Sequence, residues 1–316
     1  MQFEVSVIIP VYNAGRFVGR AVESALQFEC VKEVILIEDG SPDDSLQVCK
    51  TISAAHPAKV RLLQHPGGEN KGAAETRNVG LENARYEFIA FLDADDYYLE
   101  NRFDRDIEVF SNHADADGTH NALGISFEND DVKAAYQLKG VSQLTRVSHE
   151  TSPDELKDVL LGTHKLKKGY FHLDTFTLKK NSLQGKPGFN PALRLHQDTE
   201  WILKLAFELR LYTGEIAKPV AIRHIHPENR ITRFKSYASM ALMQESFYAW
   251  IKKTSVERKY KKVAKYNYIS SALSAENTRP KRIFKGAGFL LDGEVIFNFK
   301  FWKLILKRAL IVKKLS

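Results

Sequence analysis

The chain has 316 residues and a net charge of +7, and its composition, 44% hydrophobic and 27% charged, is that of a globular protein with one large or two modest domains. The basic excess lies in the tail, where Trp250 to Ser316 hold 17 Lys and Arg against 4 Asp and Glu, leaving 29 against 35 for the rest. This distribution disfavours a nucleic-acid partner for the whole protein, and two cysteines, Cys30 and Cys49, exclude a disulfide framework.

Four strand-and-helix units follow one another over residues 1–112. The β-branched run VSVIIPVY (5–12) precedes a helical pattern of apolar residues from Phe17 to Leu26, and strand-like runs at 31–39, 60–66 and 87–95 each precede a further helical segment. Four such units predict an α/β, Rossmann-like fold with a mostly parallel sheet flanked by helices. The first run begins without the basic flank and cleavage site of a signal peptide, so we expect a cytoplasmic protein.

Polar residues follow three of the predicted strands. Pro10, Tyr12 and Asn13 end the first, Asp39 ends the second, and an acidic group ends the fourth. Ligands of parallel sheets collect at the carboxyl ends of the strands. Loops after strands are commonly polar, but three clusters on one edge of the sheet indicate a binding site there.

The acidic group stands in the stretch FLDADDYYLE, residues 91–100. Clustered carboxylates at the end of a buried strand repel one another and lose hydration, so a cation is expected among them. Carboxylates in this arrangement suit a hard divalent ion, Mn²⁺ or Mg²⁺, that can clamp a diphosphate. Alternate residues at the end of an extended segment point to opposite sides, so we expect Asp93 and Asp95 to share a side and Asp96 to turn away.

The regular alternation fades after about residue 115. Strand-like pieces remain at 122–128, 169–180 and 211–226, and an amphipathic helix is predicted at 198–210. We expect residues 113–235 to continue the sheet with variable insertions, so that residues 1–235 form one domain.

Residues 236–316 are predicted to form a helical, basic C-terminal extension. The last segment is apolar but interrupted by Lys and Arg, so it cannot span a bilayer. Lys300, Lys303, Lys307 and Lys314 fall on one helical face, with apolar residues elsewhere on the helix. This pattern favours either an interfacial helix lying on an anionic membrane surface or a helix docked on the catalytic domain with its lysines in solvent.

Four motifs, VSVIIPVYN, LIEDGSPDDS, NKGAAETRNVGLENA and FLDADD, resemble in order and spacing those of the family 2 glycosyltransferases, inverting enzymes of the GT-A fold. The resemblance is close over residues 4–112 and looser to about residue 235. It implies a nucleotide-binding half at 1–112 and an acceptor-binding half at 113–235. It also implies that the nucleotide-sugar is bound by Pro10, Tyr12, Asp39, Arg77 and Asp93.

The resemblance further implies that Asp95 ligates the metal ion. A histidine in the segment IRHIHPENRIT resembles the family residue that closes over the diphosphate, in some members as a further metal ligand. His224 and His226 alternate and face the same side of a strand. We favour His226, and a surface or packing histidine is the alternative.

The family places its catalytic base at the start of a helix in the second half, which corresponds here to Asp198. The residue before it is Gln197 where the family usually has a glutamate. Asp198 is alternatively a helix N-cap, for which aspartate is favoured. Glu200 is the reserve candidate for the base.

The sequence therefore predicts a metal-dependent enzyme that moves one sugar from a nucleotide-sugar, UDP-linked, to a hydroxyl of a glycan acceptor. The basic tail suggests a lipid-linked acceptor at the inner face of the cell membrane, as in surface polysaccharide assembly. A nucleotide-sugar-binding module without transfer activity and a metal-dependent phosphate-processing hydrolase are the alternatives. A dehydrogenase is disfavoured because PVYNAGRF lacks GxGxxG, and a processive synthase because the chain lacks QxxRW.

Overall fold

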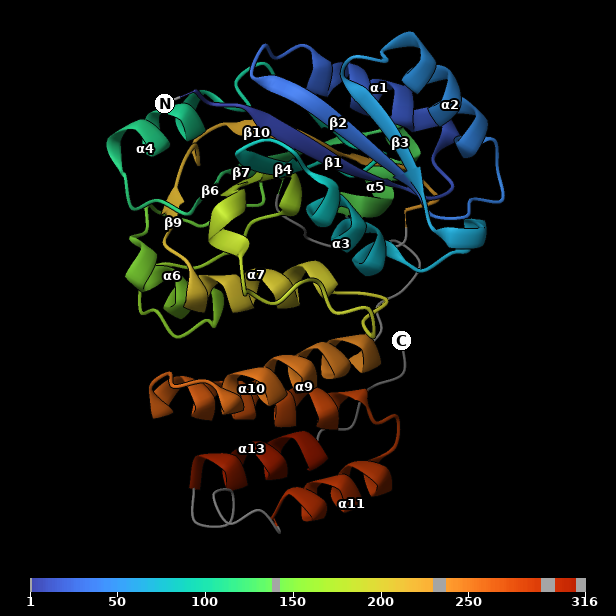
Figure 1. Ribbon diagram of the computed structural model, residues 1–316. Coiled ribbons are helices and arrows are strands. Elements are labelled where there is room, and N and C mark those ends of the chain that lie inside the picture. Colours follow the sequence, from blue (N-terminus) through green and yellow to red (C-terminus); the bar gives the residue numbers. More distant parts are fainter. Residues whose placement is uncertain (1, 138–142, 230–236, 291–298, 311–316) are drawn as a thin grey trace. The chain divides into compact units, whose positions relative to one another are not determined.

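The computed structural model describes residues 2–137, 143–229, 237–290 and 299–310 (Figure 1). The chain divides into two compact units. The first comprises Met1–Ala192 and Trp201–Thr232, and the second comprises Leu193–Glu200 and Arg233–Ser316.

The first unit is built on a seven-stranded sheet of the order β3-β2-β1-β4-β8-β6-β9. Its strands are β1 (Val5–Val11), β2 (Val31–Glu38), β3 (Val60–Gln64), β4 (Phe88–Phe91), β6 (Gly118–His120), β8 (Phe176–Lys179) and β9 (Leu211–Thr213). All neighbours are parallel except β8, which runs antiparallel to β4 and to β6. The predicted fold class is confirmed, and the second half continues the sheet of the first.

Helices cover both faces of this sheet (Figure 1). The helices along residues 15–208 are α1 (Gly15–Leu26), α2 (Ser45–Ala55), α3 (Ala73–Asn83), α4 (Asp104–Asn112), α5 (Asp130–Gln137), α6 (Pro153–Leu160) and α7 (Gln197–Glu208), with short 3₁₀ turns at Pro66–Gly68, Leu173–Thr175 and Lys180–Leu183. Of these, α5 packs on β7, which belongs to the second sheet described below. Successive side chains of β1 point to opposite faces of the sheet. Val7 and Ile9 pack in the core with α1, whereas Ile8 packs in the core on the opposite face. Continuous apolar strands need cover on both sides.

A second, three-stranded sheet contains the segment with the candidate histidines His224 and His226 at its end. It consists of β5 (Tyr97–Tyr98), β10 (Pro219–Ile225) and β7 (Ala122–Phe127), with β10 in the middle. β10 runs antiparallel to β5 and parallel to β7. Because β5 directly follows the acidic segment, this pairing brings the end of β10 beside the aspartates.

Two predicted strands of the second half are shorter than expected. The run at 169–180 contains a 3₁₀ turn, Leu173–Thr175, before β8 begins at Phe176. The run at 211–226 splits into β9 and β10, which belong to different sheets. The break falls at the turn residues between them, which include Gly214 and end at Pro219.

The second unit contains the helices α9 (Tyr237–Lys253), α10 (Arg258–Ala275), α11 (Arg279–Leu290) and α13 (Phe299–Leu310), so the predicted helical C-terminal extension is present. Apolar side chains of α13 are buried in a core shared with α10: Ile269, Leu273, Phe301, Leu304 and Ile305. Lys303 and Lys307 are exposed. The side chain of Lys300 and residue Lys314, which were predicted to share the face of Lys303, lie outside the described residues.

Among the residues that the structure describes, no helix is both long and apolar enough to span a bilayer.

Gly80 places α3, the helix that carries Arg77, directly on β1. A Cβ atom at residue 80 would lie 2.4 Å from Ile8 Cγ2, whereas one at Gly19 of α1 would meet nothing within 4 Å. We expect Gly80→Ala to lower the free energy of unfolding by about 1–3 kcal/mol through overpacking. Gly19→Ala, the matched control, should be neutral or stabilising because alanine favours a helix. Urea denaturation measures both, and equal stabilities would contradict the expectation.

Candidate functional site

The chain turns at Asp93–Asp96, directly after β4. The Asp96 amide donates a hydrogen bond of 3.0 Å to the Asp93 carbonyl, and β5 begins at Tyr97. The expectation that Asp96 turns away from Asp93 was wrong. It assumed an extended strand, but β4 ends at Phe91, and the turn directs the side chains of Asp93 and Asp96 into one cluster.

This cluster joins four side chains: Asp93, Asp96, His172 and Asp174 each offer a ligand atom, and these atoms lie within 4.8 Å of one another. The last two precede β8, the strand beside β4. Asp174 is fully buried, and its Oδ1 accepts a 3.0 Å hydrogen bond from the Asp93 amide. Its Oδ2 lies 3.1 Å from His172 Nδ1 but accepts no hydrogen bond within the described residues. Carboxylate oxygens are ligands that Mg²⁺ and Mn²⁺ prefer.

The surroundings shift the pKa values of the cluster's carboxyl groups in different directions. Burial, together with the neighbouring carboxylates of Asp95 and Asp174, raises the pKa of Asp96 well above its usual value. Burial acts in the same direction on Asp174, but the adjacent His172 outweighs it and lowers the pKa of Asp174. The cluster thus holds three carboxyl groups and one histidine, with Arg77 in contact with Asp93, and its oxygen atoms could ligate a divalent cation.

Asp95 points toward the end of β10 rather than into this cluster. Its Oδ2 lies 3.1 Å from His226 Nε2 and accepts a 2.9 Å hydrogen bond from Asn229 Nδ2. The neighbouring His224 lies with its Nδ1 3.1 Å from Ser126 Oγ, and its backbone amide donates to Asp96 Oδ1 at 2.9 Å. The structure thus brings together the two residues predicted to bind metal, Asp95 and His226.

Asp39, Tyr12 and Pro10 lie at the carboxyl ends of β1 and β2. The side chain of Tyr12 is 39% exposed, and Pro10 is partly buried within β1. Asp39 is buried, and its carboxylate accepts hydrogen bonds from the amides of Lys71 at 2.7 Å and Gly72 at 3.0 Å. Sequence analysis did not foresee this second role, in which Asp39 holds the loop that leads into α3.

Arg77, on α3, reaches the acidic turn from the other side. Its Nη2 donates a 2.6 Å hydrogen bond to Asp93 Oδ1, and its side chain is only 6% exposed. Its Nε and Nη1 are buried and have no hydrogen-bond partner within the described residues. Buried donors are normally satisfied, so these N–H groups favour an anionic ligand beside Asp93.

Asp198 and Glu200 belong to the second unit, at the start of α7. Asp198 Oδ1 lies 2.7 Å from the Thr199 backbone nitrogen. Glu200 is fully buried, and its Oε1 accepts a 2.6 Å hydrogen bond from Ser246 Oγ on α9. Glu200 therefore has a packing role, which argues against it as the reserve candidate for the base.

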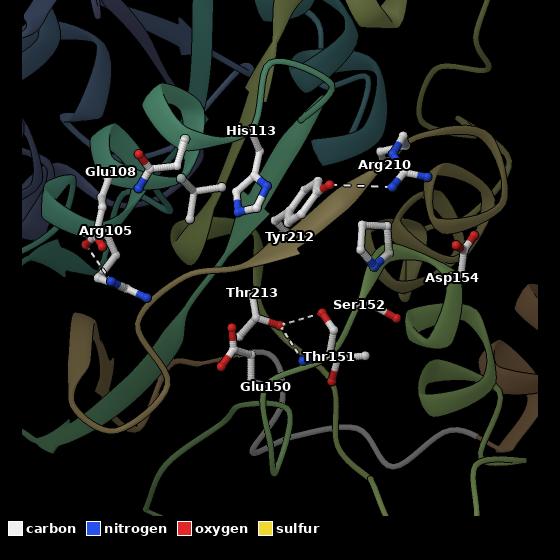
Figure 2. Close-up of a pocket in the computed structure, with 13 residues that line it drawn as sticks. Arg105, Glu108, His113, Glu150, Thr151, Ser152, Asp154, Arg210, Tyr212 and Thr213 are labelled. Carbon is white, nitrogen blue, oxygen red and sulfur yellow. Dashed lines mark hydrogen bonds and ion pairs between the residues drawn. The ribbon is translucent and has the colours of Figure 1, made fainter.

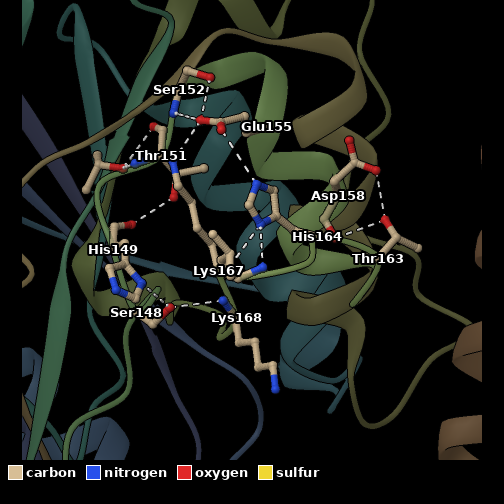
Figure 3. Close-up of polar contacts among 12 residues, drawn as sticks. Ser148, His149, Thr151, Ser152, Glu155, Asp158, Thr163, His164, Lys167 and Lys168 are labelled. Carbon is tan, nitrogen blue, oxygen red and sulfur yellow. Dashed lines mark hydrogen bonds and ion pairs between the residues drawn. The ribbon is translucent and has the colours of Figure 1, made fainter.

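The segment that precedes His172 is anchored to α6 by polar contacts, which Figure 3 shows. Glu155 accepts hydrogen bonds from the amide of Ser152 at 3.1 Å and from Lys167 Nζ at 2.9 Å. Lys167 is the main cause that lowers the pKa of Glu155 to about 2. His164 Nδ1 accepts from the Lys167 amide at 2.9 Å. These contacts fix the position of the segment that leads to His172 in the acidic cluster.

A separate hollow of about 360 Å³ lies between α4, the start of α6 and β9 (Figure 2). The rings of His113 and Tyr212 stack at its edge with centroids 4.3 Å apart. Its lining includes Arg105, Glu150 and Arg210, and none of the predicted site residues. The hollow is therefore distinct from the acidic cluster.

Sequence reasoning missed Asp174, and it considered His172 without assigning it to the site. The signal was present, because both are polar residues within the apolar run YFHLDTFTL. A polar side chain inside such a run is either paired or functional.

Comparison with known proteins supports the resemblance. The sequence profile described as Glycosyl transferase family 2 matches residues 6–170. The chain is 28% identical over 197 residues to "Glycosyltransferase GlyG" of Streptococcus pneumoniae, covering 61% of this chain and 62% of that protein. It is 38% identical over 102 residues to "Minor teichoic acid biosynthesis protein GgaA" of Bacillus subtilis, covering 30% of this chain and 22% of that protein. The chain thus spans less than two thirds of these relatives.

Solved structures show the same fold at low identity. The crystal structure of S. aureus TarS 1–349 in complex with UDP-GlcNAc has a TM-score of 0.64 and 16% identity, covering 96% of this chain and 79% of that one. A mannosyltransferase, PcManGT from Pyrobaculum calidifontis, in complex with GDP-Man and Mn²⁺, has a TM-score of 0.54 and 14% identity, covering 97% and 86%.

The contact between His172 and Asp174 can be tested by its effect on proton affinity. Burial by itself lowers the pKa of His172, but the Asp174 carboxylate outweighs this and leaves it raised. We expect Asp174→Asn to lower the pKa of His172, as measured by NMR titration of the imidazole in metal-free protein. Asp104→Asn, an exposed change on α4, should leave it unaltered. An unchanged pKa in the Asp174 variant would show that the two groups do not interact.

Proposed function

The chain belongs to glycosyl transferase family 2, and from this premise we propose that it transfers one hexosyl or N-acetylhexosaminyl group from a UDP-sugar to a hydroxyl of a glycan acceptor, with inversion. The observation that carries the proposal is the acidic turn after β4, where Arg77 contacts Asp93 and His226 contacts Asp95 at the ligand edge of the sheet.

The donor is proposed to lie along the carboxyl ends of β1, β2 and β4. The exposed ring of Tyr12, next to Pro10, provides an aromatic face for the uracil base to stack on. Asp39 keeps acceptor capacity for the ring N–H, because a carboxylate has about four lone-pair sites. The buried donors of Arg77 suit the diphosphate, and Asp93 suits the ribose and sugar. That TarS binds UDP-GlcNAc supports a UDP-sugar donor here.

The metal ion, Mn²⁺ or Mg²⁺, is proposed to be held by Asp95 with His226. An ion that also contacts a diphosphate needs open positions, and the side chain of Asp95 is 31% exposed whereas Asp96 and Asp174 are 2% and 0% exposed. We therefore assign Asp96 and Asp174 a supporting role, in which they orient the acidic turn without binding the ion. A bound divalent ion supplies Lewis-acid stabilisation of the charge on the leaving diphosphate.

Asp198 is proposed as the general base that takes the proton from the attacking acceptor hydroxyl. Its place at the start of α7 supports this role, and the buried hydrogen bond between Glu200 and Ser246 argues against Glu200 as the base. A single general base is enough for an inverting reaction, because the hydroxyl attacks the anomeric carbon directly and the diphosphate leaves from the opposite face.

The acceptor is proposed to be a lipid-linked glycan at the cytoplasmic face of the cell membrane, in surface polysaccharide biosynthesis. The similarity to two minor teichoic acid biosynthesis proteins of Bacillus subtilis, GgaA and GgaB, supports this class of acceptor. The basic C-terminal region supports contact with an anionic membrane surface, with 17 Lys and Arg against 4 Asp and Glu from Trp250 to Ser316.

Binding of UDP tests the metal site. We expect UDP to bind the protein at least roughly tenfold more tightly with Mn²⁺ than with chelator, because an ion held by Asp95 and His226 would neutralise charge on the diphosphate. Asp95→Ala should abolish this difference while leaving the stability of the protein intact, since Asp95 is partly exposed. Isothermal titration calorimetry measures both. Equal affinities with Mn²⁺ and chelator in the wild type would refute the metal-dependent mechanism.

Asp198→Asn tests the base separately from binding. The variant should bind the UDP-sugar as tightly as the wild type but lose transfer by roughly 10²–10⁴-fold, the range attributable to a general base. Transfer is measured as release of UDP with an acceptor present. Asp104→Asn serves as the control for loss of one carboxylate. Wild-type rates in the Asp198 variant would exclude this residue as the base.

A further inference from the structure

α11 has apolar residues on two different faces. Its inner face packs on α13, where a Cβ atom at Gly286 would lie 2.8 Å from Ile305 Cγ2. Arg282, four residues earlier and so on the same face, is buried, and its Nε donates a 2.9 Å hydrogen bond to the Glu276 carbonyl. This face accounts for the packing of α11 within the second unit.

The outer face of α11 is formed by Pro280, Ile283, Phe284 and Ala287, which follow one another at offsets 0, 3, 4 and 7. All four are exposed, Phe284 to 84% and Ile283 to 49%. On α13, Leu306 is 53% exposed, one residue after the Ile305 that contacts α11. A periodic apolar face in water is costly and indicates a binding surface.

Exposed lysines lie on the same two helices. Lys281 on α11 and Lys303 and Lys307 on α13 are exposed. Residues 279–316 contain 10 Lys and Arg against 2 Asp and Glu. An exposed apolar face in a basic helical region is the composition of an interfacial segment on anionic lipid.

We propose that the outer face of α11 docks on an anionic membrane surface, with Phe284 and Ile283 entering the headgroup region and Lys281, Lys303 and Lys307 meeting lipid phosphates. This inference deepens the proposed function, since it names the surface that brings the enzyme to a membrane-presented acceptor. It also moves the lipid contact away from the predicted apolar face of α13, because Phe301, Leu304 and Ile305 are buried against α10.

A second copy of the chain fits this surface less well than lipid does. Two copies that meet through the outer face of α11 would bring two basic helical regions together, and like charges at an interface weaken association. An anionic surface neutralises them.

Co-sedimentation of the full-length protein with vesicles tests the inference. We expect binding to vesicles of phosphatidylglycerol and phosphatidylcholine, and little binding to phosphatidylcholine alone. Ile283→Ser with Phe284→Ser should weaken binding to the anionic vesicles by at least roughly tenfold. Lys303→Glu with Lys307→Glu should weaken it by a similar factor and reduce its dependence on salt. Leu242→Ser, a change at a residue 55% exposed on α9, is the matched control and should bind as the wild type does.

Slow hydrolysis of UDP-sugar without vesicles, measured on the same proteins, separates the two proposals. Hydrolysis at the wild-type rate by the Ile283 and Phe284 variant, together with lost vesicle binding, supports the inference and shows that the variant is folded. Unchanged vesicle binding overturns the inference and leaves the proposed function standing. A dimer in sedimentation velocity that this variant dissociates, without vesicle binding by the wild type, also overturns it, in favour of a second copy. Vesicle binding without hydrolysis of any UDP-sugar supports the surface and counts against the proposed function.

Discussion

The gathering of carboxyl groups at the end of β4 is the constraint on which the rest of the site depends. Such a group is tolerated in a partly buried place only if cations or hydrogen-bond donors surround it. The protein supplies these from three separate parts of the fold. Arg77 comes from α3, His172 from the segment before β8, His226 from the end of β10, and the amide of His224 from β10 itself. Each contact reduces the repulsion while leaving Asp95 and Asp93 partly exposed to a ligand.

The topology explains how distant residues reach this point. β8 runs antiparallel between β4 and β6, so the residues that enter β8 arrive at the same edge at which β4 ends. The chain leaves the main sheet after β9, and β10 pairs with β5, the strand directly after the acidic turn. The antiparallel direction of β8 places His172 and Asp174 at the acidic turn, and the pairing of β10 with β5 places His226 there. A purely parallel sheet would need a helical crossover for each of these returns.

In the second unit, the amphipathic sequence pattern of a helix does not determine whether its apolar face packs on protein or on lipid. The apolar positions of α13 suit lipid and protein equally well by sequence, and the fold buries Phe301, Leu304 and Ile305 against α10. Packing in the protein core excludes water as lipid does, so both satisfy the same pattern. The exposed apolar face of α11 follows from the packing of its other face on α13, which the sequence pattern does not reveal.

The sequence by itself determined the α/β class, the first four strands with their helices, the helical basic tail and the candidate site residues of the first half, because these depend on local periodicity and on motifs with short spacing. It did not determine the turn that places Asp93 and Asp96 together, the inclusion of His172 and Asp174, or the division of residues 211–226 between two sheets. Those features depend on pairing between segments far apart in the chain. Since a short apolar run is compatible with several partners, only the folded sheet decides which residues meet.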